Sequence, residues 1–271
     1  MKTRKISSAA HPLIQQAAAL ARRRREEESG LFSAEGSHLV EAALEASAPI
    51  RQVFFSLGYR RSEEGERLLL RAERAGAELI EVPDHLLKKI CDAATPQGIM
   101  AMVASSATPL SALPRSENPL LAVCDAISDP GNLGTIIRIA DAAGADGVIL
   151  LPGCCAPYAP KVVRATSGSL FHLPMIRANP EELTEFLAGR GIPLLATDLN
   201  GDISLYDADL RGPCALVVGN ESRGTSPFLL ERAQRRLRIP MPGKAESLNA
   251  AVATALCLFE AVRQRSRPPQ P

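Results

Sequence analysis

Short apolar segments alternate with stretches of helical periodicity along most of this 271-residue chain. The segments have the length of strands, and the stretches between them repeat apolar residues every three or four positions. Strands are predicted at 31–35, 52–57, 78–82, 98–103, 120–126, 147–151, 193–197, 214–218 and 237–239, and helices at 38–46, 63–75, 133–143, 159–167, 181–189, 227–233 and 248–263. Strands that alternate with helices in this way predict an α/β fold with a mostly parallel sheet covered on both faces.

One segment interrupts the alternation. Residues 105–119, SSATPLSALPRSENP, contain three prolines and no apolar period, which is typical of a linker between domains. We therefore predict a small α/β domain at 1–106, a linker at 107–118 and a larger α/β domain at 119–265. The Pro-rich end, 266–271, is predicted to be disordered.

Charge is balanced over the whole chain, which has 31 Lys and Arg residues and 30 Asp and Glu residues and so a formal net charge of +1. Nucleic-acid binding would therefore depend on local patches. The clearest patch is Arg22, Arg23, Arg24 and Arg25, at the end of a short amphipathic helix, which we interpret as an RNA-binding arm. Two alternatives stay open: a solvated helix face partly neutralised by the glutamates at 26–28, and an organellar transit peptide.

Several classes of protein are disfavoured by what the sequence lacks. The six cysteines form no C-x-x-C pair and the four histidines are scattered, so we expect neither a disulfide framework nor a metal site. No apolar run approaches the roughly 20 residues that span a bilayer, so we expect no membrane insertion and a cytoplasmic location. Neither G-x-G-x-x-G after the first strand of the second domain nor a P-loop is present, which disfavours a nicotinamide or nucleoside-triphosphate enzyme.

Three polar loops follow predicted strands of the second domain, where an open parallel sheet binds its ligands. The loop at 129–134, DPGNLG, opens the helix that carries Arg138, and Asn132 is expected to cap that helix. The loop at 219–224, GNESRG, holds an amide, a carboxylate and a guanidinium between glycines.

The third loop, at 239–249, is IPMPGKAESLN. Its prolines make it stiff and leave backbone groups free to bind a flat ligand edge. Each of the three loops also has an ordinary structural interpretation. Ser247 could be the N-cap of the last helix, Arg138 could form an ion pair with Asp141, and the loop at 219–224 could be a solvated turn.

Together the three loops resemble the three motifs of the SpoU/TrmH branch of the SPOUT RNA 2′-O-ribose methyltransferases. The corresponding residues are Asn132-Leu133-Gly134 through Arg138, VVGNESRG at 217–224 and IPMPGKAESLNAAVATALCLFE at 239–260. The segment RATSGSLFHLP at 164–174 is similar to the family's middle segment. ISSAAHPLIQQAAAL at 6–20, LFSAEG at 31–36 and TPQGI at 95–99 are similar to the substrate-binding domain of many members, a relative of ribosomal proteins that bind RNA.

The resemblance implies an α/β-knot catalytic domain with a deep trefoil knot, S-adenosylmethionine as the cofactor, RNA as the substrate and a homodimer in which both subunits form the site. The residues that it implies for cofactor binding are Thr197, Gly219, Asn220, Glu221, Ile239, Met241, Ser247 and Leu248. Those implied for catalysis are Arg138, Asn132, Glu221, Ser247 and Asn249. The first candidate substrate is large-subunit ribosomal RNA and the second is transfer RNA; a non-catalytic RNA-binding or ribosome-assembly protein with this fold is the rival of another class.

Family proposals make the arginine that corresponds to Arg138 the base that deprotonates the 2′-hydroxyl. A guanidinium whose pKa lies above about 12 rarely accepts a proton, so we expect Arg138 to bind a phosphate of the RNA and to stabilise the developing alkoxide instead. Asn132 would then position the ribose, Glu221 would orient Arg138 or the hydroxyl, and Ser247 and Asn249 would complete the pocket. In the N-terminal domain, basic contacts that include Arg60 and Arg61 would bind RNA.

Overall fold

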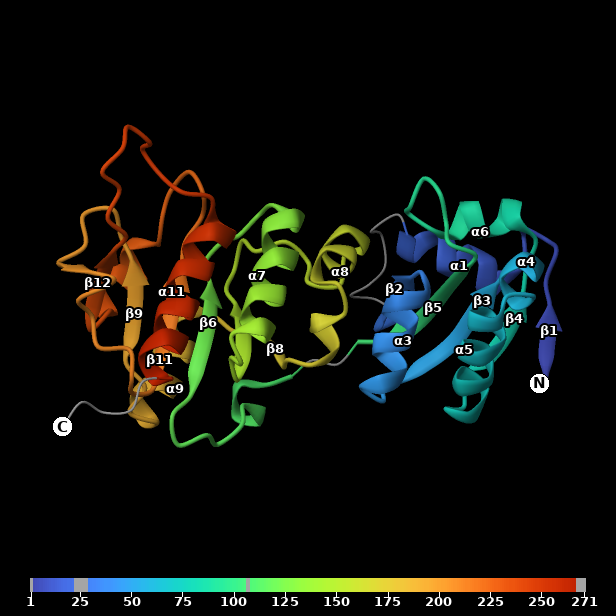
Figure 1. Ribbon diagram of the computed structural model, residues 1–271, viewed down its shortest axis with the longest axis horizontal. Coiled ribbons are helices and arrows are strands. Elements are labelled where there is room, and N and C mark those ends of the chain that lie inside the picture. The colour runs from blue at the N-terminus through green and yellow to red at the C-terminus, as the bar shows by residue number, and fades with distance from the viewer. Residues whose placement is uncertain (1, 22–28, 106–107, 267–271) are drawn as a thin grey trace. The chain divides into compact units, whose positions relative to one another are not determined.

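The computed structural model describes residues 2–21, 29–105 and 108–266. Arg22, Arg23, Arg24 and Arg25, and all but the first residue of the predicted tail, lie outside the described residues. The chain divides into two compact units (Figure 1). The first comprises Met1–Ser106 with Ala156–His172, and the second comprises Ala107–Cys155 with Leu173–Pro271. No helix within the described ranges is both long enough and apolar enough to span a membrane.

The first unit is built on a mixed sheet, which has five strands within the described residues. The strand order is β1 (Thr3–Lys5), β4 (Glu78–Glu81), β3 (Ile50–Phe55), β5 (Ile99–Ala104) and β2 (Leu31–Glu35). The helices are α1 (Pro12–Ala21), α3 (Ser37–Glu45), α4 (Leu57–Arg60), α5 (Glu63–Arg74), α6 (Asp84–Ile90) and α8 (Pro160–Thr166). Since β5 runs antiparallel to β3 and β2, the beginning of β5 lies at the edge where β2 and β3 end.

The core of the first unit joins the sheet to α1 and α6. Ile14 of α1 and Leu87 of α6 are buried with Phe54, Ile80 and Met100 of the sheet. Contacts between α3 and α5, and between these helices and the sheet, complete the α/β arrangement. Helix α6 and strand β1 were not expected from the sequence, because each is too short to show a clear period.

The segment Ala156–His172 packs with the first unit, although the sequence analysis placed it inside the second domain. The Phe32 ring stacks on Tyr158, with 4.7 Å between the ring centroids, and on Phe171, at 6.0 Å. The Arg164 guanidinium lies 2.6 Å from a carboxylate oxygen of Asp92. These partners are distant in sequence, so local periodicity could not assign the segment to this unit.

The second unit is built on a sheet in which every strand pairing is parallel, with seven strands within the described part of the chain. The strand order is β10 (Ile203–Ser204), β12 (Arg235–Arg238), β9 (Leu194–Thr197), β11 (Cys214–Val218), β6 (Leu120–Cys124), β7 (Gly147–Leu150) and β8 (Met175–Arg177). Strands β6 and β11 are buried at every position, as central parallel strands are expected to be.

Helices cover both faces of this sheet, as predicted. Helices α9 (Pro180–Gly189) and α10 (Pro227–Arg232) bury Leu183, Leu187 and Leu229 in the core on one face. Helices α7 (Pro130–Ala142) and α11 (Ala250–Arg265) contact each other and run side by side in Figure 1. Part of the predicted linker also belongs to this core, since Leu110 and Leu113 are buried there around a short 3₁₀ helix, η1 (Leu110–Ala112).

Both helix caps expected from the sequence are wrong. Helix α7 begins at Pro130, and its N-cap is Asp129, whose carboxylate accepts a hydrogen bond from the Asn132 backbone N–H at 2.8 Å. Proline suits the first helical position, where no backbone donor is required, so the helix begins earlier than apolar periodicity suggests. Helix α11 is capped by Asn249 rather than Ser247, and the Asn249 side chain accepts from Ala251 N at 2.9 Å.

Candidate cofactor and catalytic site

A cavity of about 530 Å³ lies at the carboxyl ends of β9, β11 and β12 in the second unit. These strands are neighbours in the parallel sheet, so the loops that follow them meet at one edge. Every residue predicted to bind the cofactor lines this cavity, namely Thr197, Gly219, Asn220, Glu221, Ile239, Met241, Ser247 and Leu248.

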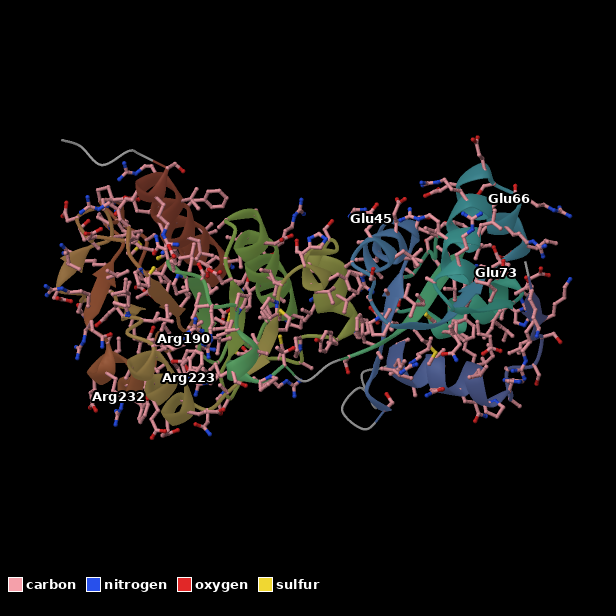
Figure 2. All side chains as sticks on the ribbon, turned by 90° about the horizontal axis from the view of Figure 1, so that it is seen from below. Glu45, Glu66, Glu73, Arg190, Arg223 and Arg232 are labelled. Carbon is pink, nitrogen blue, oxygen red and sulfur yellow. The ribbon has the colours of Figure 1, made fainter. Side chains whose placement is uncertain are left out.

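The loop after β11 is held in one conformation by Asn220. The Asn220 side-chain amide donates to the Ala126 carbonyl at 2.9 Å, and its oxygen accepts from the backbone N–H groups of Ser222 at 3.0 Å and Arg223 at 3.2 Å. A Cβ atom on Gly219 would lie 2.1 Å from the Thr225 nitrogen, so only glycine fits there. The Asn220 side chain therefore shapes the loop, while the Arg223 side chain is exposed (Figure 2) and Arg223 is one of the residues that line the cavity.

Three residues from the three loops form one hydrogen-bonded chain. The Asn132 side chain donates to a Glu221 carboxylate oxygen at 2.5 Å. The Asn249 side chain in turn donates to the Asn132 amide oxygen at 2.9 Å. The structure thus brings together the predicted catalytic residues Asn132, Glu221 and Asn249, which come from the beginning of α7, the loop after β11 and the N-cap of α11.

The other two predicted catalytic residues stand outside this chain of hydrogen bonds. Ser247 is exposed and lines the cavity. Arg138 is exposed on α7, about 9 Å along the helix axis from Asn132 and on a different face, and it does not line the cavity. Within the described ranges the Arg138 guanidinium has no hydrogen-bond or ion-pair partner, so the alternative of an ion pair with Asp141 is not what the structure has.

Sequence reasoning missed several residues that build or line the cavity. Asp125, buried at the end of β6, accepts from the Ser226 backbone N–H at 2.7 Å, and the Thr225 hydroxyl donates to the Thr197 carbonyl at 2.9 Å. Leu199 and Asn200, in the loop after β9, line the cavity as well. Position could have identified Leu199 and Asn200, because they follow the strand predicted at 193–197 just as the three loops follow theirs, whereas Asp125 lies inside the strand predicted at 120–126.

Two family models match this chain. The model described as the SpoU rRNA Methylase family matches residues 119–259, and the one described as the MRM3-like substrate binding domain matches residues 11–101. The chain belongs to the SpoU rRNA methylase family. The family membership predicted from the motifs is therefore confirmed, as is the α/β fold class predicted from the alternation of strands and helices.

Relatives of this SpoU family chain include enzymes named for the methylation of 23S rRNA. It is 37% identical over 243 residues to the 23S rRNA (uridine(2479)-2′-O)-methyltransferase of Streptomyces viridochromogenes, which covers 88% of this chain and 84% of that protein. It is 31% identical over 256 residues to the 23S rRNA (guanosine(2553)-2′-O)-methyltransferase RlmP of Bacillus subtilis, with 94% of this chain and 98% of that protein covered.

Solved structures of similar proteins include the cofactor. The AdoMet-bound rRNA methyltransferase from Sinorhizobium meliloti matches with a TM-score of 0.88 and 33% identity, over 96% of this chain and 98% of that one. The SpoU methyltransferase AviRb from Streptomyces viridochromogenes, in complex with AdoMet, matches with a TM-score of 0.86 and 36% identity, over 94% of this chain and 98% of that one. These matches cover nearly the full length of both proteins, so each of these relatives contains counterparts of both units.

Proposed function

We propose that this chain transfers the methyl group of S-adenosylmethionine to a ribose 2′-hydroxyl of large-subunit ribosomal RNA. The observation that carries the proposal is the hydrogen-bonded chain of Asn249, Asn132 and Glu221 at the cavity, in a member of a family whose named relatives methylate 23S rRNA. Such a protein would work where ribosomal RNA is made and assembled, and a cytoplasmic location is part of this proposal.

The cavity suits the cofactor in size and in chemistry. Its volume of about 530 Å³ is that of an ordinary small-molecule site. Leu199, Leu230 and Met241 offer apolar surface for an adenine ring, and the backbone of the loop after β11 offers hydrogen-bonding groups. Thr197, Gly219 and Ile239 would hold the cofactor at the strand ends. When bound, the cofactor supplies a methyl group on a positively charged sulfur.

The protein's own residues would position the ribose. Because Asn249 fixes the Asn132 amide and Asn132 donates to Glu221, the carboxylate and the amide are held in place before RNA arrives. Ser247, at the cavity wall, would contact the ribose or the cofactor. A guanidinium cannot serve as a base at neutral pH, so Arg138 would bind the neighbouring phosphate and stabilise the developing alkoxide, while the proton leaves to that phosphate or to water.

The site would be completed by a second copy of the chain. Arg138 does not line the cavity of its own subunit, so we propose that the partner's Arg138 reaches it in a homodimer. The exposed face of α11 supports this proposal, since Val252 and Phe259 are 48% and 46% exposed and lie two turns apart on one side of the helix. Replacing both with Glu should give a monomer by light scattering that still binds S-adenosylhomocysteine but transfers no methyl; a dimer that stays intact would refute this arrangement.

The proposed activity is tested by transfer of labelled methyl from S-adenosylmethionine to unmodified 23S rRNA and, separately, to transfer RNA. We expect label in 23S rRNA, at a linkage that resists alkali because its 2′-oxygen is methylated. Label in transfer RNA instead would change the substrate class. Cofactor binding without transfer to either RNA would favour the non-catalytic RNA-binding protein.

A further inference from the structure

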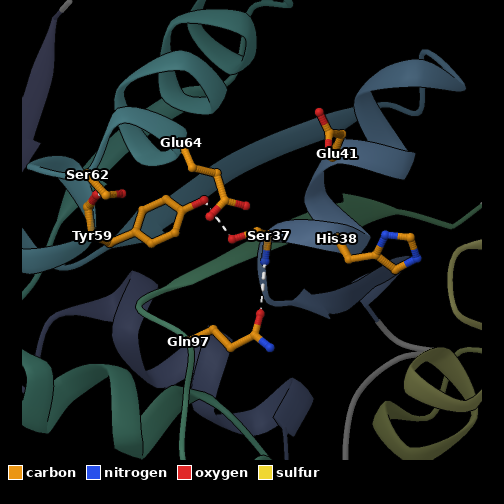
Figure 3. A pocket seen from close by; sticks show the side chains of 7 residues that line it. All are labelled: Ser37, His38, Glu41, Tyr59, Ser62, Glu64 and Gln97. Atoms are coloured by element: carbon orange, nitrogen blue, oxygen red, sulfur yellow. Dashed lines mark hydrogen bonds between the residues drawn. The ribbon is translucent and has the colours of Figure 1, made fainter.

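The first unit holds its own pocket, at the edge of the sheet where β2 and β3 end and β5 begins (Figure 3). Its volume is about 530 Å³. Polar and charged side chains form its walls, among them Ser37 from the beginning of α3, Tyr59 from α4, Glu64 from α5 and Gln97 from the loop before β5. None of the lining residues, all of which belong to the described part of the chain, is Lys or Arg. Such a wall suits a neutral, hydrogen-bonding ligand better than a phosphate.

The walls are held in place before any ligand binds. The hydroxyl groups of Ser37 and Tyr59 are hydrogen-bonded at 2.8 Å, and burial, the largest influence, raises the pKa of Tyr59, so its hydroxyl stays protonated. The Ser37 backbone N–H donates to the Gln97 side-chain oxygen at 3.3 Å. A Cβ atom on Gly36 would lie 2.5 Å from that same oxygen, so the loop before β5 fits closely against the beginning of α3.

The free hydrogen-bonding groups of the pocket form a definite pattern. Because the Gln97 oxygen accepts from Ser37, its amide nitrogen is left as a donor. The Glu41 carboxylate is already paired with Arg67 at 3.0 Å and Arg71 at 2.8 Å. Glu64 has no ion pair within the described residues, so both of its oxygens remain acceptors. Figure 3 shows Glu64 and Gln97 on opposite sides of Ser37.

We infer that this pocket receives one unpaired guanine base of the substrate RNA. Guanine presents two adjacent donors, N1–H and N2–H, beside the O6 acceptor, and a carboxylate with two free oxygens on one side of the pocket, with an amide donor on the other, complements that edge. Adenine and cytosine each offer one donor group beside an acceptor, and uracil offers a single N–H between two acceptors. Unpaired bases in RNA are commonly recognised through such edges. The inference rests on the proposed function, because it takes RNA as the ligand.

Charge around the pocket is consistent with this ligand. Arg61 directly precedes Ser62, which lines the pocket, and Arg61 is exposed. Arg67, one turn after Glu64 on α5, keeps 57% of its side chain exposed while it pairs with Glu41. These cations can bind the phosphates on either side of a base whose edge is held by neutral groups and Glu64.

The test measures the affinity of the full-length chain for heptaribonucleotides of sequence UUUNUUU, in which N is guanosine, adenosine, cytidine, uridine or inosine. We expect the guanosine oligonucleotide to bind about tenfold more tightly than the other four. Inosine lacks the N2 amino group, so it reports on the second hydrogen bond to Glu64. The substitution Glu64→Gln should remove the preference for guanosine and change the affinity for the uridine oligonucleotide less than twofold.

Glu63→Gln is the matched control, because Glu63 lies in the same first turn of α5 and does not line the pocket. It should leave the guanosine preference intact. Equal affinity for all five oligonucleotides, a preference for another base, or a guanosine preference that survives Glu64→Gln would overturn the inference. Methyl transfer to 23S rRNA is measured in parallel: its absence in the wild type would refute the proposed function, whereas transfer without base preference would refute the pocket alone.

Discussion

Each unit holds a cavity of about 530 Å³, but the two cavities have different walls. In the first unit, polar side chains such as Ser37, Glu64 and Gln97 line the pocket. In the second, loop backbone and apolar side chains such as Leu230 and Met241 contribute much of the lining. Equal volume therefore says nothing about the ligand, and the wall chemistry separates a site for a base edge from a site for an adenosyl group.

Sheet topology accounts for much of this difference. Among the described residues, the strands of the second unit's sheet pair only in parallel, so its cavity is built from loops that follow strands β9, β11 and β12. The first unit has an antiparallel strand, β5, which brings Gln97, a residue before a strand, to the edge where β2 and β3 end. A mixed sheet can therefore place residues from loops that follow strands and from loops that precede strands around one pocket.

The largest effect is expected from Arg138→Ala. Loss of a group that stabilises developing charge should lower methyl transfer at least about a hundredfold. Binding of S-adenosylhomocysteine, measured by calorimetry, should not change, because Arg138 does not line the cavity of its own subunit and the partner's Arg138 is proposed to bind the RNA phosphate, not the cofactor. Arg138→Lys keeps the charge but loses the planar fork, and we expect it to restore only part of the activity. A loss of cofactor affinity in Arg138→Ala would contradict the separation of catalysis from cofactor binding.

Gly219→Ala should damage the second cavity alone. The added Cβ would lie 2.1 Å from the Thr225 nitrogen, so the loop must move, at a cost of about 1–3 kcal/mol in the free energy of unfolding. Cofactor affinity should fall with it, while the guanosine preference of the first unit stays. Gly243→Ala is the control, since nothing lies within 4 Å of its Cβ position. Thermal unfolding measures the change in stability, and calorimetry measures the change in cofactor affinity. If Gly219→Ala changes neither quantity, the loop is not rigid.

Asn249 has two roles that two substitutions can separate. Asn249→Ala removes the N-cap of α11 and the hydrogen bond to Asn132, and should lower stability by about 1 kcal/mol and methyl transfer about tenfold. Asn249→Asp keeps the oxygen that caps the helix but loses the donor. It should therefore retain most of the stability and still lose transfer, as urea unfolding and initial rates would show. Full activity of Asn249→Asp would remove the hydrogen-bonded chain from the mechanism.

The smallest effect concerns Glu81, at the β1–β4 edge of the first unit. The pKa of Glu81 is lowered, chiefly by its hydrogen bond to Lys5 and also by Arg60, and the carboxylate lies 3.0 Å from Lys5. A carboxyl with a lowered pKa stabilises the fold above the pKa of the unfolded chain, and that stabilisation is lost as the pH falls below about 4.

Glu81→Gln should thus reduce the free energy of unfolding by less than about 1 kcal/mol at pH 7. The difference from wild type should shrink as the pH falls through the lowered pKa of Glu81, as urea unfolding at pH 7 and at pH 3 would show. Glu78→Gln is the control, because the Glu78 side chain is 40% exposed against 11% for Glu81, so its ion pair with Arg4 should contribute less. A difference that persists unchanged at pH 3 would mean that packing, not charge, is responsible.

The sequence by itself determined the elements with strong patterns. The fully apolar run at 214–218 became β11 with the same bounds, and the loops after predicted strands already held the residues that line the cavity. These features are local, because burial on both faces requires a continuous apolar strand and parallel strands place their following loops at one edge.

Only the tertiary structure decided which distant residues meet. Asn132 lies 89 residues from Glu221 and 117 from Asn249 along the chain, and no local period relates them. The packing of Ala156–His172 with the first unit depends in the same way on Phe32 and Asp92, far away in sequence. Such contacts arise from the packing of whole elements, and a local sequence pattern contains no information about that packing.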